Sequence, residues 1–128
     1  MTEETPREVT VTFAGRCRGN PGPGSWKATV EEPRTGKRRV ENGTDQDTTS
    51  NRMELTAALK GIGQVRPGAN LTMVGNSQYV VRGMGEWVAG WQARGWRTND
   101  GKRLENADLW GALVAAVKRH RRVTWRTG

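Results

Sequence analysis

The spacing of hydrophobic and polar residues predicts three strands in the first third of the chain. Apolar and polar residues alternate with a period of two over Val9–Phe13, which indicates a strand with one buried face. Segments 25–32 and 37–43 flank the turn-forming sequence Pro33-Arg34-Thr35-Gly36, as expected for a hairpin. Residues 15–24, rich in glycine and proline, are predicted to form the loop that joins the first strand to this hairpin.

The remainder of the chain predicts helices and two more strands. Apolar residues recur at helical spacing from residue 51 to 65, and Pro67-Gly68 ends that run. The later predicted elements are a buried strand over 69–75, a short helix that Ser77 caps and that ends near Gly83, helices over 86–94 and 106–120, and a last strand over 123–125.

Length and composition indicate one soluble domain. The 128 residues suffice for a single core, so we expect a flexible tail over residues 1–8 and one domain over 9–128. No run approaches the roughly 20 apolar residues of a spanning helix, and the start of the chain lacks the features of an export signal. A cytoplasmic location is therefore expected. The chain has one cysteine, Cys17, and one histidine, His120, which excludes an internal disulfide and argues against a structural zinc site.

The net charge of +8 favours a polyanionic partner. The alternative is a basic surface that is merely solvated. The densest basic run holds Lys118, Arg119, Arg121, Arg122 and Arg126 within nine residues. This run could contact phosphates, or the same region could contact a second copy of the chain or another protein.

Several motifs occur in the order found in one enzyme family. They are the segments 19–24 (Gly-Asn-Pro-Gly-Pro-Gly), 49–55 (Thr-Ser-Asn-Arg-Met-Glu-Leu), 77–80 (Ser-Gln-Tyr-Val), 83–98 and 106–110. Together they resemble type 1 ribonuclease H from Val9 to about Trp125. The resemblance implies an α/β, RNase H-like fold: a five-stranded mixed sheet of three antiparallel and then two parallel strands, flanked by helices, with the terminal helix of the family absent.

The same resemblance shows where the chain departs from the family at catalytic positions. The family hydrolyses the RNA strand of an RNA/DNA hybrid with two Mg²⁺ ions, which four carboxylates hold. By position, the first carboxylate falls on Ala14, the second on Glu54 and the third on Asn76, while the fourth would follow Gly128. Glu54 is thus the one inherited carboxylate. We therefore expect no metal site and no cofactor, with Mg²⁺ or Mn²⁺ relevant only to residual activity.

Residues that contact nucleic acid in the family are better represented. By position, some residues match groups that face the RNA strand or grip a DNA phosphate in the family. Others are arginines next to them or belong to the family's basic protrusion, which falls within residues 83–98 here. The full set is Arg16, Cys17, Arg18, Asn20, Thr49, Ser50, Asn51, Gln78, Trp87, Arg94 and Arg97. A purely structural alternative explains part of this set: Asn51 would cap the helix with Glu54 as its capping-box partner, and the glycines would form a tight turn.

The six tryptophans divide into two groups. Trp26, Trp110 and Trp125 are predicted to lie in the core. Trp87, Trp91 and Trp96 are the tryptophans of the protrusion. Trp87 would contact DNA sugars or pack internally, and internal packing is the better interpretation for Trp91.

Three functional hypotheses follow. The leading one is a catalytically deficient RNase H-fold protein that binds nucleic acid, preferably RNA/DNA hybrid or double-stranded RNA, without metal-dependent cleavage. The second is a weak or partner-completed endoribonuclease acting on RNA/DNA hybrids. The third is a protein-interaction module in a larger nucleic-acid-processing assembly, in which a homodimer or another protein covers the surface left by the missing terminal helix.

Overall fold

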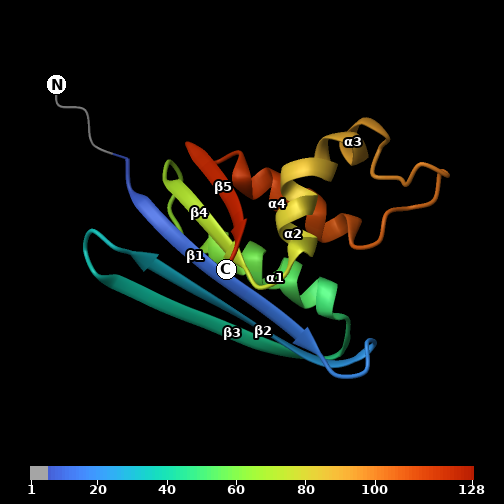
Figure 1. The fold of residues 1–128 in the computed structure, drawn as a ribbon, viewed down its shortest axis with the longest axis horizontal. Coiled ribbons are helices and arrows are strands. Elements are labelled where there is room, and N and C mark those ends of the chain that lie inside the picture. The colour runs from blue at the N-terminus through green and yellow to red at the C-terminus, as the bar shows by residue number, and fades with distance from the viewer. Residues whose placement is uncertain (1–5) are drawn as a thin grey trace.

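The computed structural model describes residues 6–128 and contains one five-stranded sheet with the order β3-β2-β1-β4-β5 (Figure 1). The strands β1 and β2 pair antiparallel, as do β2 and β3, whereas β4 is parallel to both β1 and β5. This confirms the predicted mixed sheet. The strands span β1 (Glu8–Cys17), β2 (Gly22–Glu32), β3 (Lys37–Thr48), β4 (Asn70–Gly75) and β5 (Arg122–Thr127).

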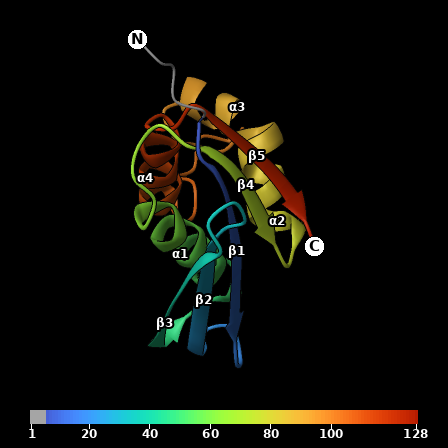
Figure 2. The same cartoon turned by 90° about the vertical axis from the view of Figure 1, so that its left-hand side faces the viewer.

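The helices gather on one side of the sheet and at its β5 end. α1 packs against β1 and β2, and α4 packs against α1 on the same face (Figure 2). Over the part of the chain that the structure describes, no helix lies on the opposite face of β1, β2 and β3 (Figure 1). The helices span α1 (Ser50–Gly63), α2 (Gln78–Arg82), the π-helical turn η1 (Gly83–Trp87), α3 (Val88–Ala93) and α4 (Ala107–Val117).

The core lies between the sheet and α1 and α4. Alternate β1 residues Val11 and Phe13 are buried, as are Leu55 and Ile62 of α1, because both elements present one apolar face at their own periodicity. Trp110 of α4 is fully buried in this layer, while Trp26 and Trp125 are half-buried against it. The prediction that these three tryptophans belong to the core is confirmed.

Several predicted boundaries were wrong. β1 continues through residues 15–17, which were expected to form a loop, because Arg16 pairs with Ser25 and Cys17 with Gly24. The short helix α2 ends at Arg82, as predicted, but η1 and α3 continue the helical path to Ala93 in place of a separate helix over 86–94. α4 ends at Val117 rather than at residue 120.

The expected tail is also shorter than predicted. β1 begins at Glu8, and the carbonyl of Arg7 accepts a hydrogen bond of 2.8 Å from the Asn70 amide at the start of β4. These residues are therefore tied to the sheet. Residues 1–5, the rest of the predicted tail, lie outside the described residues. No helix among residues 6–128 is both long and apolar enough to cross a membrane.

Phe13 and Gly75 are sterically complementary in the sheet. Phe13 of β1 and Gly75 of β4 are partners in the parallel ladder. A Cβ added at Gly75 would lie 2.7 Å from the Phe13 ring, closer than side chains tolerate. The ring also meets Trp125 edge to face, with 6.0 Å between centroids. The large residue at 13 therefore requires the missing side chain at 75.

This coupling can be measured by a double-mutant cycle. We expect Gly75→Thr alone to lower the free energy of unfolding by about 1–3 kcal/mol through overpacking, and Phe13→Thr alone to lower it by about 3 kcal/mol through a cavity. The double variant should lose clearly less than the sum, because the threonine at 75 fills part of the cavity. Urea unfolding measures all four proteins, and additive losses would contradict the coupling.

Candidate active site and nucleic-acid interface

The candidate site lies at the carboxyl end of β4, where β1 continues beyond its parallel partner. Phe13 pairs with Gly75 in the parallel ladder, so the next residues along the two strands, Ala14 and Asn76, lie at the same edge of the sheet. In α/β sheets this edge, beyond the carboxyl ends of parallel strands, is where ligands bind. Ala14 is half-buried and Asn76 is exposed.

A close helix contact brings Glu54 to this edge. A Cβ added at Gly15 would lie only 2.3 Å from the backbone nitrogen of Glu54, so glycine is required for α1 to approach β1 so closely. The Glu54 side chain is 4% exposed, and Ser77, the residue after Asn76, donates a hydrogen bond to its Oε1. The structure therefore brings together the three positions at which the family would carry carboxylates.

Burial raises the pKa of the Glu54 carboxyl, and the hydrogen bond from Ser77 partly offsets the increase. A buried carboxylate loses the hydration that stabilises its charged form, and a single hydroxyl donor replaces only part of it. Glu54 therefore remains protonated to a higher pH than an ordinary glutamate.

The residues at the start of α1 have different roles from those in the structural alternative. Thr49 is the N-cap: its Oγ1 accepts a hydrogen bond of 3.1 Å from the Arg52 amide. Asn51 lies inside the first turn and is exposed, so its predicted capping role was wrong. Glu54 forms no capping box because its side chain turns to Ser77. Asn51 is therefore left for other contacts.

The loop between β1 and β2 is fastened to this helix. Asn20 Oδ1 accepts a hydrogen bond of 2.8 Å from the Ser50 amide. The thiol of Cys17 lies 3.2 Å from the Thr48 carbonyl and 3.4 Å from that of Gly22, and donates to these oxygens. The structure thus places these predicted binding residues next to one another, although the side chains of Cys17, Asn20 and Thr49 already have partners within the protein. Gln78, at the start of α2, is exposed.

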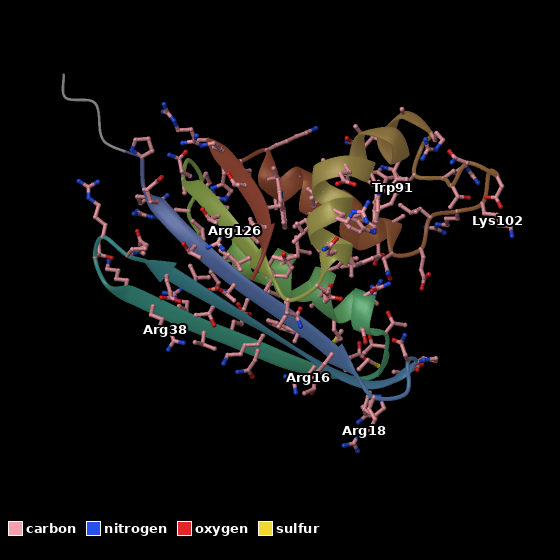
Figure 3. All side chains as sticks on the ribbon, in the orientation of Figure 1. Arg16, Arg18, Arg38, Trp91, Lys102 and Arg126 are labelled. Atoms are coloured by element: carbon pink, nitrogen blue, oxygen red, sulfur yellow. The ribbon has the colours of Figure 1, made fainter. Side chains whose placement is uncertain are left out.

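The basic protrusion is a separate part of the surface, far from Arg16 in Figure 3. Trp87 is 37% exposed, and the guanidinium of Arg82 stacks over its ring at 5.1 Å from the ring centroid. Trp91 packs on Trp110 at 4.9 Å, which confirms its structural interpretation. The other two predicted binding residues of the protrusion, both exposed, brace its loop: Arg94 donates to the Arg97 carbonyl, and Arg97 to the Gly101 carbonyl.

Arg52 is a positioning residue that the sequence did not reveal. Its guanidinium forms a two-pronged pair with Asp108, at 2.8 and 3.2 Å, and contacts Asn106 Oδ1 at 3.2 Å. Asn106 and Trp110 both reach the Tyr79 hydroxyl, at 3.4 and 3.3 Å. This network joins α1, α2 and α4 behind the site. Arg52 and Asp108 are 56 positions apart in sequence, and no local pattern predicts their pairing.

The side chains at the site do not match a binding site for two magnesium ions. Mg²⁺ requires oxygen ligands, mostly carboxylates, in near-octahedral geometry. Among residues 6–128, no cluster of three or more His, Cys, Asp and Glu side chains could hold a metal ion. Ala14 offers only a methyl group, Asn76 an amide, and Glu54 a single carboxylate already engaged by Ser77.

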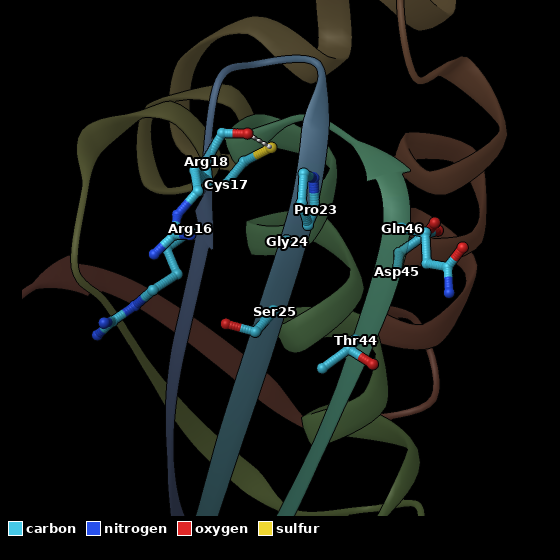
Figure 4. Close-up of a pocket in the computed structure, with 9 residues that line it drawn as sticks. All are labelled: Arg16, Cys17, Arg18, Pro23, Gly24, Ser25, Thr44, Asp45 and Gln46. Carbon is cyan, nitrogen blue, oxygen red and sulfur yellow. Dashed lines mark hydrogen bonds between the residues drawn. The ribbon is translucent and has the colours of Figure 1, made fainter.

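A pocket of about 500 Å³ adjoins the site at the end of β1, β2 and β3 (Figure 4). Arg16 and Arg18 line it together with Ser25, Thr44 and Asp45. Both arginines are exposed, and Arg16 lies two residues from Ala14 on β1. In the basic run over residues 118–126, Arg122 and Arg126 are exposed on β5, and Val123 and Trp125 between them pack on the core.

Comparison with solved structures gives the same fold. LC9-RNase H1, described as a type 1 RNase H with the type 2 active-site motif, is 32% identical with a TM-score of 0.82, over 99% of this chain and 65% of that chain. LC11-RNase H1, solved in complex with RNA/DNA hybrid, is 16% identical with a TM-score of 0.72, over 94% of this chain and 84% of that chain. The latter likeness shows the fold alone.

The raised pKa of Glu54 makes a prediction about stability. The unfolded chain loses this proton near the ordinary glutamate pKa of about 4.3, whereas the folded chain loses it only at higher pH. Ionisation of Glu54 therefore lowers the stability of the folded state as the pH rises above about 4.3. Glu54→Gln, which is neutral at every pH and can still accept from Ser77, should therefore be more stable than the unaltered protein at pH 7. The difference should shrink as pH falls to 4. Urea unfolding at both pH values checks this, with Glu105→Gln, an exposed residue away from the site, as control. An equal or lower stability of Glu54→Gln at pH 7 would contradict the prediction.

Comparison with related proteins corrects the leading functional hypothesis. Ribonuclease H of Cupriavidus metallidurans is 43% identical over 119 residues, which cover 93% of this chain and 80% of the relative. The RNase H family model matches residues 6–127. These matches support ribonuclease H activity and contradict the interpretation of a catalytically deficient protein that binds without cleaving; they favour the second hypothesis instead. The chain belongs to the RNase H family.

Proposed function

We propose that this chain is an endoribonuclease that acts on RNA/DNA hybrids, with activity that is weak in the isolated chain or completed by a partner. The observation that carries the proposal is the position of Glu54. Its carboxyl is held by Ser77 at the shared edge of β1 and β4, next to the two other family positions. Family membership and the named relatives supply the reaction class.

The chain's own residues can carry out substrate binding and orientation. Asn51 and Gln78 are exposed amides on the first turns of α1 and α2, on either side of Glu54. Amide groups both donate and accept hydrogen bonds, which suits them to the 2′-hydroxyls and base edges of a minor groove. Ser77 fixes the Glu54 carboxyl through Oε1 alone. We propose that Glu54 acts on the RNA strand at this edge of the sheet.

The sequence first suggested that no cofactor is needed. Because the family normally uses Mg²⁺, we propose instead that hydrolysis depends on Mg²⁺ or Mn²⁺. The poor fit of Ala14 and Asn76 accounts for weak activity, because a divalent ion would lack most of its protein oxygens. A second protein chain could supply further carboxylates, since Asn76 is open to solvent.

The central experiment is cleavage of a labelled RNA/DNA hybrid in Mg²⁺ and in Mn²⁺. We expect slow cleavage of the RNA strand that EDTA stops and that Glu54→Gln abolishes. Rates measured against protein concentration separate the two forms of the proposal: a first-order dependence indicates weak activity in the single chain, and a second-order dependence indicates completion by another copy. Cleavage that persists in Glu54→Gln would contradict the role of Glu54, and the absence of cleavage at every concentration tested would contradict activity without a different partner.

Restoring the missing oxygens provides a gain-of-function test. The double substitution Ala14→Asp with Asn76→Asp should raise the rate of hybrid cleavage by at least about a hundredfold, as expected when metal ligands are returned to a metal-dependent nuclease. Ala115→Asp, which adds a carboxylate to the exposed side of α4 away from the site, serves as the matched control and should leave the rate unchanged. An unchanged rate in the double variant would mean that more than two ligands limit activity.

Binding residues can be tested apart from cleavage. Asn51→Ala and Gln78→Ala should each weaken binding to RNA/DNA hybrid several-fold while leaving binding to double-stranded DNA nearly unchanged, because that duplex lacks 2′-hydroxyls. Gln92→Ala, an exposed glutamine in α3 outside the site, is the control. Fluorescence anisotropy measures the dissociation constants, and equal losses for both duplexes would contradict readout of the RNA strand.

A further inference from the structure

Two cations stand on the open face of the sheet beside the position of the missing first carboxylate. Lys27 of β2 is the direct partner of Ala14 in the antiparallel ladder, and Arg16 lies two residues beyond Ala14 on β1. Directly paired residues have Cβ atoms about 5 Å apart, and residues two apart on a strand share a face. Lys27 and Arg16 therefore flank Ala14 on one surface, and both are exposed.

The surface between these cations is hollow. A depression of about 390 Å³ is lined by Ala14, Arg16, Lys27 and Asn42. It shares Arg16, and also Ser25 and Thr44, with the pocket in Figure 4, in which Arg16 and Arg18 extend from the same side of β1. The depression is large enough for a phosphate group with its attached sugar atoms, and it carries polar donors around its rim.

The positive charge of this depression is not neutralised within the described residues. Lys27 and Arg16 belong to none of the salt bridges that these residues form. Glu41 of β3 is the partner of Ala28, the residue next to Lys27, and accepts a hydrogen bond from Gln64. Glu31 lies four residues from Lys27 on β2, and Asp45 lies at the rim of the adjoining pocket. Asp45 Oδ1 already accepts a hydrogen bond from the Asp47 amide. The surface around Ala14 therefore favours an anion.

We propose that Lys27 and Arg16 bind a backbone phosphate of the nucleic acid directly, beside Ala14, and so supply positive charge where the family relies on metal ions. The inference rests on the proposed function only in taking RNA/DNA hybrid as the ligand. Ammonium and guanidinium groups form strong charge-assisted hydrogen bonds with phosphate. Their contact with the backbone needs no divalent ion.

The arrangement is physically consistent with the substitution at position 14. A carboxylate there would pair with Lys27 across the ladder and remove its charge from the ligand. The methyl group of Ala14 leaves the ammonium free, and the same ammonium repels a divalent cation. One side-chain exchange thus shifts the depression from cation binding towards anion binding.

Binding of labelled RNA/DNA hybrid in EDTA tests the inference without cleavage. Lys27→Ala and Arg16→Ala should each raise the dissociation constant by about tenfold. Each should also reduce the slope of log K against log salt by about one, because one phosphate contact is lost. Lys60→Ala removes the same charge from the exposed side of α1, on the opposite side of the sheet, and should leave both quantities unchanged. Thermal unfolding verifies that all three variants remain folded.

The possible outcomes separate the inference from the proposed function. Loss of affinity in Lys27→Ala and Arg16→Ala but not in Lys60→Ala supports the inference, even if no cleavage is found in Mn²⁺. Equal effects in all three variants, an unchanged affinity in Lys27→Ala, or no binding of hybrid in EDTA would overturn it, even if cleavage is found. Lys27→Arg should restore most of the affinity, which a loss caused by altered packing would not allow.

Discussion

The close approach of α1 to β1 at Gly15 is the contact on which the candidate site depends. Any side chain at this position would overlap the backbone at Glu54, so glycine alone permits the helix to sit at this depth. The depth decides where Glu54 lies: under the ends of β1 and β4, buried, and within reach of Ser77. The Arg52 pair with Asp108 and the cap at Thr49 then hold the helix start in place. Site geometry therefore follows from a backbone contact and not from the catalytic side chains themselves.

This separation between scaffold and chemistry explains how the family fold persists with altered site residues. Ala14 and Asn76 stand where the resemblance places carboxylates; Ala14 is half-buried and Asn76 exposed, so neither position needs a charged group for packing. Phe13 and Gly75 beneath them are buried, and the ring at 13 occupies the space that a side chain at 75 would need. Changes at the surface of the site alter electrostatics, whereas changes beneath it are limited by volume. The fold is consistent with both kinds of change.

Sequence patterns were informative to different degrees in different parts of the chain. Alternation over Val9–Phe13 and helical spacing after Asn51 identified β1 and α1, because each element buries one face along its whole length. The same patterns missed the extension of β1 to Cys17, where pairing with Gly24 overrides the turn tendency of a glycine-rich segment. They also assigned the cap to Asn51, although the backbone is extended at Thr49 and its hydroxyl makes the bond. The helix predicted over residues 86–94 is instead the π-helical turn η1 followed by α3, because that turn continues the helical path after α2 without a break.

By itself, the sequence determined the fold class, the order of the elements and the core tryptophans, and its resemblance to the family indicated the candidate positions 14, 54 and 76. These follow from periodicity and from motifs that lie within short segments. Only the tertiary structure decided that Glu54 is bonded to Ser77, that Arg52 joins α1 to α4, and that Lys27 stands opposite Ala14. Each of these relations joins residues at least 13 positions apart, and strand register and helix packing, which set such distances, arise from the whole core and not from local sequence.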